Sequence, residues 1–404
     1  MRKIIVLFCI LLTNCSFDNK TGIWQNSNVT VSKSKDKFKD FKTLYSKQKL
    51  FDSLIIPPPN LKISIDKPVV NLKWNDEFFK ENNNLDNFSY KNENKIIFKS
   101  KKLTKYITGE KILYDGSNLI LNDEKGNITV YSIDKLERVF KYNFYQKKYK
   151  RKKKKLNTII DNNIIYVADN IGYLYALDYL NKRLIWAKNY KIPFRSNIKI
   201  VDDKIVLSDQ DNSLLVINKK NGEKLKSIPT EQKTLKNNFV NSLALTNSKI
   251  FYLNTFGTIY ALDRQTFKVN WFLNMNQSVD LNLNNLFYSN SILADENKVI
   301  ISTVPFLYVL NSNTGATIIK EPITSVSKPI ITKKGLFLIS NDNLLVYKDL
   351  QAQKVLYSVN IANEIASFLN TKKKNIIVKS FFMVNNEVFI FLENSYLVKF
   401  DING

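Results

Sequence analysis

The side chains that most often carry out chemistry in proteins are scarce in this sequence, which has no histidine and two cysteines among 404 residues. Histidine is the commonest proton shuttle and metal ligand near neutral pH, and a haem-attachment site also needs it. The acidic residues stand mostly in turns, as Asp178 and Asp263 do, where they accept hydrogen bonds from backbone N–H groups. No pair of them is spaced as a calcium cage requires. We therefore expect no catalytic residue, no metal and no cofactor.

Cys15 is the one side chain for which the sequence predicts a modification. In MRKIIVLFCILLTNC, a basic pair precedes an apolar run that is too short for a transmembrane helix, which is typical of a secretory signal. Leu12 stands three residues before Cys15, a spacing that resembles the bacterial lipobox, in which the cysteine is acylated and becomes the first residue. We predict a signal peptide over 1–14 and a lipid on Cys15. The alternative is an ordinary signal peptide with an unmodified cysteine.

The residue after the cysteine predicts the compartment. Ser16 stands where an aspartate would, in many Gram-negative bacteria, retain a lipoprotein in the inner membrane. We therefore expect the protein at the outer membrane, lipid-anchored on its periplasmic face. Nucleic acid is not an expected partner in that compartment.

The chain is strongly basic, with a formal net charge of +25. Such an excess favours binding to nucleic acid, to an anionic membrane surface or to an acidic partner. The densest run is KKYKRKKKK, from Lys147 to Lys155. We interpret it as a solvated loop. The alternative is an electrostatic contact with anionic phospholipid or with an acidic face of a partner.

Composition divides the chain into segments. Residues 15–58 are polar and rich in lysine and run into the three prolines at 57–59, which predicts a flexible, lipid-anchored tether that stiffens at its end. A short helix over DKFKDFKTLYSKQKLFDSLI is the alternative. Residues 59–94 lead into the folded part. Residues 95–404 consist of short apolar, β-branched and aromatic runs separated by Asn, Asp and Gly, a pattern typical of strands and turns.

A repeat organises the segment 95–404. Its clearest copies are IIYVADNIGYLYALDYLNKRLIW and IFYLNTFGTIYALDRQTFKVNW. Seven copies align on one turn residue, which is Asp134, Asp178, Asn218, Asp263, Asn311, Asp349 and Asp401. An interval of roughly 40 to 50 residues with about four strands per copy is typical of a β-propeller blade. We predict an all-β fold, a propeller of seven four-stranded blades.

The two ends of this repeat region predict how the ring closes. The last copy, EVFIFLENSYLVKFDING, ends where its outermost strand should begin, and the run KIIFKSKKL over 95–103 has strand character but no blade of its own. A ring removes its open sheet edges by joining its first and last strands. We therefore predict that 95–103 is an N-terminal strand that completes the final blade.

These features together resemble the BamB family, the lipoproteins of the outer-membrane β-barrel assembly machinery. The resemblance rests on the lipobox, the proline-rich tether, the blade repeats and the segment KPVVNLKW. That segment is similar to an Asn-x-x-Trp segment of the family, with Asn71 and Trp74 at the matching positions. The resemblance implies a non-catalytic scaffold that binds BamA and other assembly-complex components. It also implies assistance in folding and inserting nascent outer-membrane β-barrel proteins.

The chain departs from that family in several places. Family propellers have eight blades and seven are counted here. The turn glycine is present only at Gly222 and Gly315, and the closing tryptophan only at Trp186 and Trp271. The same repeat occurs in quinone-dependent dehydrogenases, which need a calcium cage, a carboxylate base and an aromatic floor. Because the sequence shows no such cage, we interpret Trp186 as packing between blades and expect the protein not to be an enzyme.

The expected partner site is a loop. The family resemblance implies that BamA docks between the third and fourth repeats, a place that TEQKTLKNNFVNSLA occupies over 230–244. Leu235, Lys236 and Phe239 are the predicted contact residues because they combine apolar and cationic character, although Phe239 is alternatively the first core residue of the next blade. Exposed strand edges would offer nascent barrels a second contact by β-augmentation.

Two rival functions stay open at this point. One is a periplasmic propeller that binds a glycan or a small solute in an axial pocket lined by polar and aromatic groups. The other is a quinone-dependent dehydrogenase.

Overall fold

The computed structural model describes residues 15–17, 24–26, 50–91, 93, 96, 99–145, 149–231, 241–276, 287–325, 327–373 and 376–403. The chain divides into two compact units, residues 1–48 and residues 49–404. In the first unit, β1 (Cys15–Phe17) and β2 (Trp24–Asn26) form an antiparallel pair. The second unit holds the other described strands.

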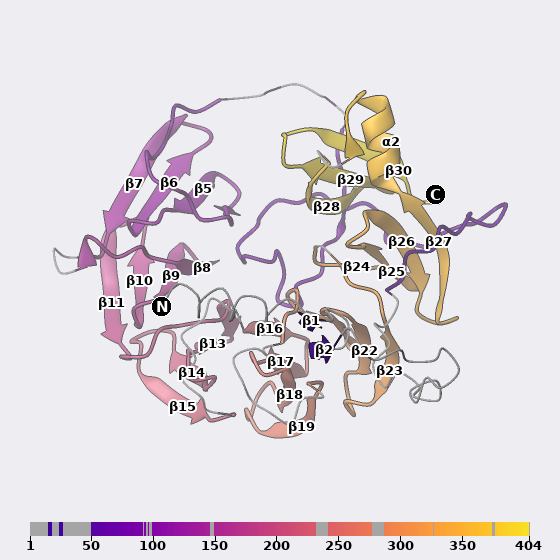
Figure 1. Ribbon diagram of the computed structural model, residues 1–404. Coiled ribbons are helices and arrows are strands. Elements are labelled where there is room, and N and C mark those ends of the chain that lie inside the picture. The colour runs from indigo at the N-terminus through magenta and orange to yellow at the C-terminus, as the bar shows by residue number, and fades with distance from the viewer. Residues whose placement is uncertain are drawn as a thin grey trace, which may run out of the picture. The chain divides into compact units, whose positions relative to one another are not determined.

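The second unit is a ring of seven four-stranded sheets, named blades 1 to 7 in chain order (Figure 1). From the inner to the outer edge, the strands of blades 1 to 4 are β4 (Leu113–Tyr114), β5 (Asn118–Asn122), β6 (Asn127–Ser132) and β7 (Glu137–Asn143); β8 (Leu156–Asp161), β9 (Ile164–Asp169), β10 (Tyr173–Asp178) and β11 (Arg183–Asn189); β12 (Lys199–Val201), β13 (Lys204–Ser208), β14 (Leu214–Asn218) and β15 (Lys224–Ile228); and β16 (Ser242–Leu245), β17 (Lys249–Leu253), β18 (Thr258–Asp263) and β19 (Val269–Asn274). Those of blades 5 to 7 are β20 (Leu293–Ala294), β21 (Lys298–Ser302), β22 (Leu307–Asn311) and β23 (Thr317–Glu321); β24 (Ile330–Ile331), β25 (Gly335–Ile339), β26 (Leu344–Asp349) and β27 (Lys354–Asn360); and β3 (Asn87–Phe88), β28 (Val378–Val384), β29 (Glu387–Leu392) and β30 (Leu397–Asp401).

The predicted all-β, seven-bladed propeller is confirmed, and the aligned turn residues explain its regularity. Asp178 and Asp263 each end the third strand of a blade, and their carboxylates accept hydrogen bonds from backbone N–H groups two or three residues later. In blades 1 to 6 the register between the third and fourth strands shifts just before this turn. Such a bulge bends the strand at the same place in each copy.

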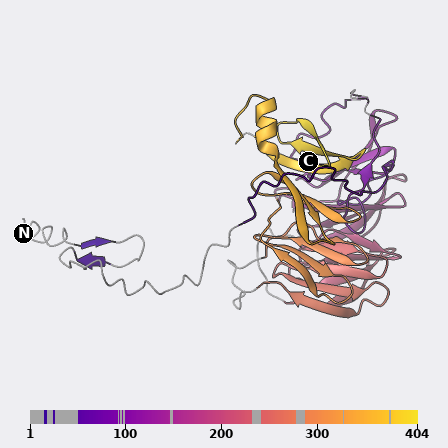
Figure 2. The ribbon, with the colours of Figure 1, turned by 90° about the vertical axis from the view of Figure 1, so that its right-hand side faces the viewer.

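Apolar side chains fill the space between successive blades. Six buried clusters join blades 1 and 2, 2 and 3, 3 and 4, 4 and 5, 5 and 6, and 6 and 7. The last cluster also takes in the buried face of α2 (Ile361–Phe368), which lies beside blade 7 (Figure 2). Among the described residues, no such cluster joins blade 7 to blade 1. Burial of apolar surface therefore holds six of the seven junctions.

Two tryptophans pack between blades, as predicted for Trp186. The ring of Trp186 in β11 lies against Gly222 of blade 3, and Trp271 in β19 lies against Gly315 of blade 5. Each indole N–H donates to a carbonyl oxygen of the next blade, at 3.1 and 3.0 Å. Each of the two tryptophans therefore occurs with a glycine in the turn of the next blade, because the indole ring leaves no room there for a side chain.

At two other junctions, a lysine or a tyrosine stands in place of the tryptophan and donates an equivalent hydrogen bond. The Lys226 ammonium of blade 3 donates to the carbonyl oxygen of Phe267 in blade 4 at 3.0 Å. The Tyr357 hydroxyl of blade 6 donates to the carbonyl oxygen of Ile402 in blade 7 at 2.8 Å. A donor at this position thus reaches the turn of the following blade at four junctions, although the side chains differ.

Blade 7 is completed differently from the prediction. An N-terminal strand does join it, but this strand is β3 at Asn87–Phe88, which pairs parallel with β28 at the inner edge. The prediction that 95–103 is this strand is wrong, because residues 96 and 99–103, which the structure describes, form no strand. The chain passes through the centre of the ring before blade 1 begins, so it meets the inner edge of blade 7 and not the outer one.

The segment that passes through the centre is a strap, residues 74–88, which contacts the inner part of every blade in turn (Figure 1). At blade 1, Trp74 and Tyr114 exchange two backbone hydrogen bonds, with N···O distances of 2.6 and 2.9 Å. At blade 2, the N–H of Ile160 donates to the carbonyl oxygen of Asn75 at 2.9 Å. The strap therefore begins as an addition to two inner sheet edges.

Asn83 joins the strap to blades 3, 4 and 5. Its side-chain amide donates to the carbonyl oxygens of Leu243 in blade 4 and Ile292 next to β20 of blade 5, each at 2.8 Å. Its side-chain oxygen accepts from the buried ammonium of Lys199 in blade 3 at 2.7 Å, and that ammonium also reaches Asp76 at 2.7 Å. Asn83 has a φ of 64°, a left-handed conformation that asparagine tolerates better than most residues. Both its backbone and its side chain therefore need asparagine.

The strap ends on blades 6 and 7. The side-chain oxygen of Asn84 accepts from the N–H of Ile331 in β24 at 2.9 Å, and its amide donates back to the Ile331 carbonyl at 3.1 Å. Asn87 and Phe88 then form β3 beside β28. The strap thus links blade 7 to blade 1, where no apolar cluster among the described residues does so.

We expect Asn83→Ala to lower the free energy of unfolding by about 3–5 kcal/mol, because two buried carbonyls and a buried ammonium lose a partner. Urea denaturation followed by tryptophan fluorescence measures this loss. Asn394→Ala, at an exposed turn of blade 7, is the control and should cost less than about 0.5 kcal/mol. A similar small cost for both variants would contradict the role assigned to the strap.

We expect Gly315→Ala to cost about 2–3 kcal/mol, because a Cβ there would lie 2.6 Å from the Trp271 ring and the residue has a φ of 75°. A double-mutant cycle separates the two causes. In a Trp271→Leu background, the contribution of the ring contact disappears and the cost of Gly315→Ala should fall by about half. An unchanged cost would show that backbone strain alone is responsible.

Candidate binding cavity

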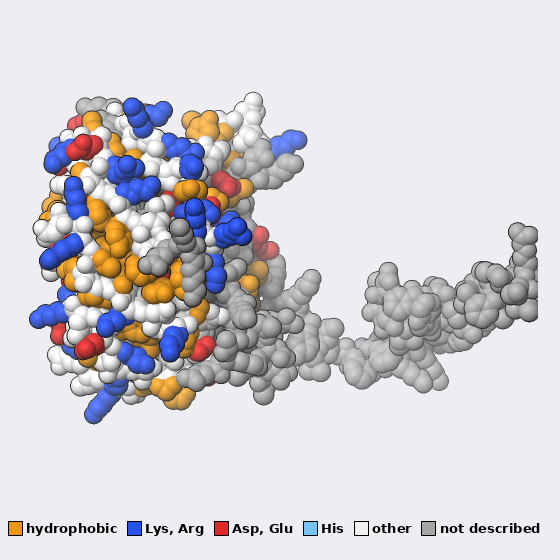
Figure 3. Space-filling view, turned by 90° about the vertical axis from the view of Figure 1, so that its left-hand side faces the viewer, with side chains coloured by type: hydrophobic (Ala, Val, Ile, Leu, Met, Phe, Trp, Pro, Cys, Tyr) orange, Lys and Arg blue, Asp and Glu red, His pale blue; other side chains and the backbone are white. Residues whose placement is uncertain are grey.

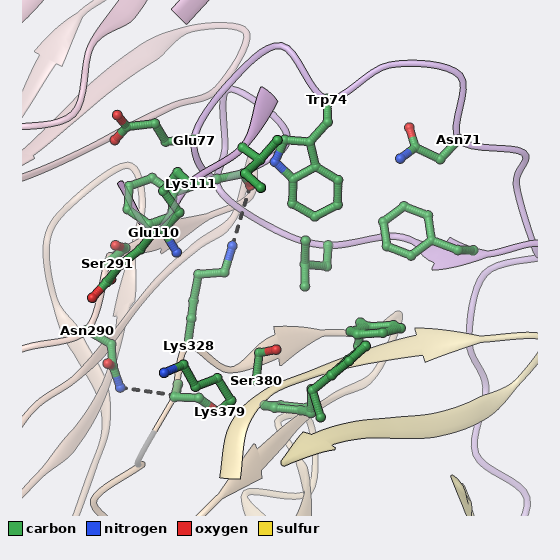
Figure 4. A pocket seen from close by; sticks show the side chains of 18 residues that line it. Asn71, Trp74, Glu77, Glu110, Lys111, Asn290, Ser291, Lys328, Lys379 and Ser380 are labelled. Atoms are coloured by element: carbon green, nitrogen blue, oxygen red, sulfur yellow. Dashed lines mark hydrogen bonds between the residues drawn. The ribbon is translucent and has the colours of Figure 1, made fainter. Parts of the chain in front are cut away.

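A cavity of about 960 Å³ lies where the strap meets blades 1 and 7 (Figure 4). Strap residues, the start of blade 1, strands β28 and β29 of blade 7 and the inner loops before blades 5 and 6 line it. This is the junction at which the described residues form no shared apolar cluster. The cavity is therefore a consequence of how the strap closes the ring.

Aromatic side chains form much of its wall. Phe382 and Phe391 of blade 7 lie with their ring centroids 5.8 Å apart, and Phe391 is 39% exposed. On the strap side, Phe79 packs between Trp74 and Phe88 at centroid distances of 4.9 and 5.1 Å. The rings of Trp74 and Phe88 are thereby held in place where they line the cavity.

Lys328 extends into the cavity from the loop before β24 (Figure 4). Its ammonium donates to the backbone carbonyl of Asn83 and lies 5.4 Å from the centroid of the Phe78 ring. Burial, together with the nearby positive charges of Lys199 and Lys111, lowers the pKa of Lys328 to about 7. This amine therefore exchanges its proton near neutral pH.

Glu77 lies on the blade 2 side of the same cavity. Its carboxylate accepts a hydrogen bond from the N–H of Thr158 at 2.8 Å, and the residue is among those that line the cavity. Burial raises the pKa of Glu77 to about 7, an effect that the hydrogen bond from Thr158 partly offsets and the charge of Asp76 increases. An acid and an amine that both titrate near neutral pH thus line one aromatic cavity.

The chemistry of the cavity is that of binding. Polar groups on an aromatic wall can orient a ligand or a peptide side chain, and Lys111, Lys328 and Lys379 favour an anionic group. Among the described residues, His, Cys, Asp and Glu form no group of three or more that could hold a metal ion. In the same part of the chain, no helix is long and apolar enough to cross a membrane.

The residues singled out in the sequence have different outcomes. Cys15 is the first residue of β1, and its side chain is not described. Leu235, Lys236 and Phe239 lie outside the described residues, as do the first two residues of the basic run that starts at Lys147. The structure brings Asn71 and Trp74 together on the wall of the cavity.

The sequence analysis missed the polar residues at the centre of the ring. Asn83 and Lys199 are both fully buried and Asp76 nearly so. A signal was present in DEFFKENNN over 76–84. This run is dense in polar residues, contains two phenylalanines, and lies outside the blade repeats. Such a run outside the blades can be buried only where other blades offer it hydrogen-bond partners.

Comparison with known proteins gives one family and a common fold. The family model described as "Outer membrane protein assembly factor BamB" matches residues 145–358, more than half of the chain. The crystal structure of BamB from Moraxella catarrhalis is similar with a TM-score of 0.58 at 14% identity, over 73% of this chain and 85% of that one. No curated protein matches the chain.

A designed protein shares the architecture as well. The crystal structure of the computationally designed Ika8 protein is similar with a TM-score of 0.54 at 14% identity, over 72% of this chain and 83% of that one. At such low identity, both structural similarities show the fold alone.

The raised pKa of Glu77 predicts a pH dependence of stability. Between pH 4.5 and 7 the folded state binds this proton and the unfolded state releases it, so stability falls as pH rises, by up to about 3 kcal/mol. Glu77→Gln keeps the acceptor for Thr158 and removes the charge, so its stability should change less over this range. Chemical denaturation at pH 5, 6 and 7.5 measures the difference.

Glu110→Gln is the matched control, because Glu110 lines the same cavity but is exposed. It should keep the pH dependence of the wild-type protein. Equal pH dependence of Glu77→Gln and wild type would show that Glu77 is ionised without cost in the folded protein.

Proposed function

The chain belongs to the BamB family of outer membrane protein assembly factors, and on that premise we propose that it is a non-catalytic scaffold of outer-membrane protein assembly. The single observation that carries the proposal is the family match over residues 145–358, which span blades 2 to 5 and most of blade 6. The ring supports it physically, because six apolar junctions and one strap give a rigid frame on which loops can present a binding surface.

The proposed location is the periplasmic face of the outer membrane, with residues 1–14 removed and a lipid on Cys15. Residues 15–58 form the proposed tether, whose last part is attached to the ring because the N–H of Phe51 donates to the carbonyl oxygen of Pro322 and Ile55 pairs with Ser358 of β27. Residues 59–94 lead the chain into the propeller. The compact unit that contains the ring begins at Lys49, so a segment of more than thirty residues separates Cys15 from it. A linker of that length lets an anchored propeller reach partners well away from its lipid.

The proposed partner is BamA, which binds through the loop 230–244 between blades 3 and 4. Both stems of this loop are firmly held. At one stem the Glu231 carboxylate accepts from Asn254 at 2.6 Å and from Tyr260 at 2.9 Å. At the other, the amide of the buried Asn241 donates to Ser208 and Tyr252, each at 2.9 Å. Fixed stems lower the entropy that an interface loop loses on binding.

The outer blade edges support the proposed contact with nascent barrel strands. No further strand or isolated bridge lies beside the outer strands β7, β11, β15, β19, β23 and β30 among the described elements, whereas the edge of β27 is partly covered by Ile55, which exchanges two backbone hydrogen bonds with Ser358. Lysines on several of them, such as Lys188 and Lys226, discourage unspecific pairing. A partner strand with acidic residues would bind such an edge by β-augmentation.

We expect the double variant Leu235→Ala and Phe239→Ala to reduce recovery of BamA at least about tenfold in a mild-detergent pull-down from outer membranes, as loss of two apolar anchors does elsewhere. Mass spectrometry identifies and quantifies the recovered barrel protein. Leu225→Ala, at a 51% exposed position on β15, is the control and should recover as much as the wild type. Wild-type protein that recovers no barrel partner would contradict the scaffold proposal.

The cavity favours one second candidate, a propeller that binds a small anionic solute. Its aromatic walls and three lysines, described above, are the observation that supports this. Native mass spectrometry of protein purified from its own membranes tests it, because a ligand of defined mass should be retained. Loss of that mass in Lys328→Met would place the ligand in the cavity.

A further inference from the structure

A second pocket, of about 800 Å³, lies on the outer side of blade 1 and is lined largely by cations. Lys125 contributes from the turn between β5 and β6, Lys141 from β7, and Lys150, Arg151 and Lys154 from the loop that leads to blade 2. The aromatic residues Tyr106 and Tyr145 and two asparagines complete the lining. Five positive charges and no carboxylate therefore face one space.

The carboxylates nearest the pocket do not line it, although Asp123 and Asp169 lie close enough for their charges to act on Lys154. Asp123 accepts from Thr104 and from the amide of Asn127. Asp169 accepts from the Tyr145 hydroxyl at 2.6 Å, and Glu124 pairs with Lys153 at 3.3 Å. Among the described residues, none of the five cations that line the pocket forms a salt bridge.

Lys154 shows that the positive charge is built into the fold. Its side chain is only 6% exposed, its ammonium donates to the carbonyl oxygen of Tyr149 at 2.5 Å, and it lies 5.0 Å from the centroid of the Tyr145 ring. Burial and the charge of Lys125 lower the pKa of Lys154, and the carboxylates of Asp123 and Asp169 offset part of this effect. A bound anion would remove the repulsion between these two ammonium groups.

The other cations are held less tightly. Lys125 lies 5.7 Å from the centroid of the Tyr106 ring, while Lys141, Lys150 and Arg151 are exposed. Figure 3 shows the face of the molecule that carries β7 and β11, where Lys and Arg side chains are widespread and acidic side chains are sparse. The surface around the pocket therefore attracts anions toward it.

We propose that this pocket binds a phosphate group carried by an anionic ligand. A phosphate monoester has a charge of about −1.5 to −2 at neutral pH and several acceptor oxygens, which suits a cluster of lysines with one arginine better than a single carboxylate does. The volume exceeds what one phosphate ion needs and lies in the usual range of ligand pockets. The ligand thus has a body beyond its phosphate. A soluble phosphate monoester fits this description, and so does a phospholipid headgroup, whose phosphodiester carries one negative charge and also presents acceptor oxygens.

The test uses the full chain and two probes. Glycerol 3-phosphate, titrated in a calorimeter, represents a soluble ester, and vesicles of phosphatidylglycerol, compared with phosphatidylcholine in a sedimentation assay, represent a lipid headgroup. The double variant Lys125→Gln and Arg151→Gln should weaken binding at least about tenfold. Its control is Lys268→Gln with Lys354→Gln, two exposed lysines on other blades that remove the same charge.

The outcomes separate the sources. Binding of both probes, with the pocket variant impaired and the control within about twofold of wild type, supports a general phosphate site. If only the phosphatidylglycerol vesicles bind in a pocket-dependent way, the ligand is a lipid headgroup. If only glycerol 3-phosphate does so, the ligand is a soluble phosphate ester. Equal impairment of both double variants, or no binding of either probe, overturns the proposal. Thermal melting of both variants verifies that they are folded.

Discussion

A single buried asparagine shows what the ring depends on. Asn83 donates to carbonyls of blades 4 and 5 and accepts from a lysine of blade 3, while its backbone carbonyl accepts from a lysine that precedes blade 6. Each hydrogen bond contributes only about 0.5–1.5 kcal/mol net, yet leaving such buried groups without partners costs more. The strap therefore constrains the positions of all seven blades at once, in addition to the apolar contacts between neighbours.

The strap also explains the chemistry at the centre of the ring. It places Asp76 and Glu77 beside Lys199 and Lys328, where burial makes charge expensive unless it is paired. The Asp76–Lys199 pair is almost completely buried and short, at 2.7 Å. Glu77 and Lys328 face the cavity instead and have pKa values near neutrality. Closure by a strap of polar and aromatic residues, at the junction that none of the six buried apolar clusters spans, thus produces both a rigid frame and a lined cavity.

The repeat was predictable from the sequence because each blade is formed by the same kinds of local interaction, which recur along the chain. Turn residues such as Asp178 and Asp263 and the apolar runs beside them set strand positions that depend on neighbours in the chain. The ring closure was not predictable in the same way. Strand character in 95–103 is a local property, whereas the use of Asn87–Phe88 as β3 depends on β28, almost three hundred residues later.

The residues of the candidate cavity show the same contrast between local features, which the sequence reveals, and long-range contacts, which it does not. Asn71 and Trp74 were singled out only as part of a family segment, not as site residues, and the structure places them on the wall of the cavity. Lys199 and Lys328 could not be found, because a lysine in a strand or a loop is usually solvated and only the strap buries these two. The loop 230–244 is a proposed partner site whose contact residues were predicted from the sequence, and the structure describes only its two stems.

Hydrogen–deuterium exchange at three amides tests most directly whether one strap holds the blades. The N–H groups of Ile160, Leu245 and Ala294, in blades 2, 4 and 5, donate to the strap carbonyls of Asn75, Glu81 and Asn82. If the strap is released as one unit, the three amides should be protected and should give one common free energy of opening once their intrinsic exchange rates are taken into account. Three different opening free energies, or exchange as fast as in exposed turns, would show that the blades hold together without the strap.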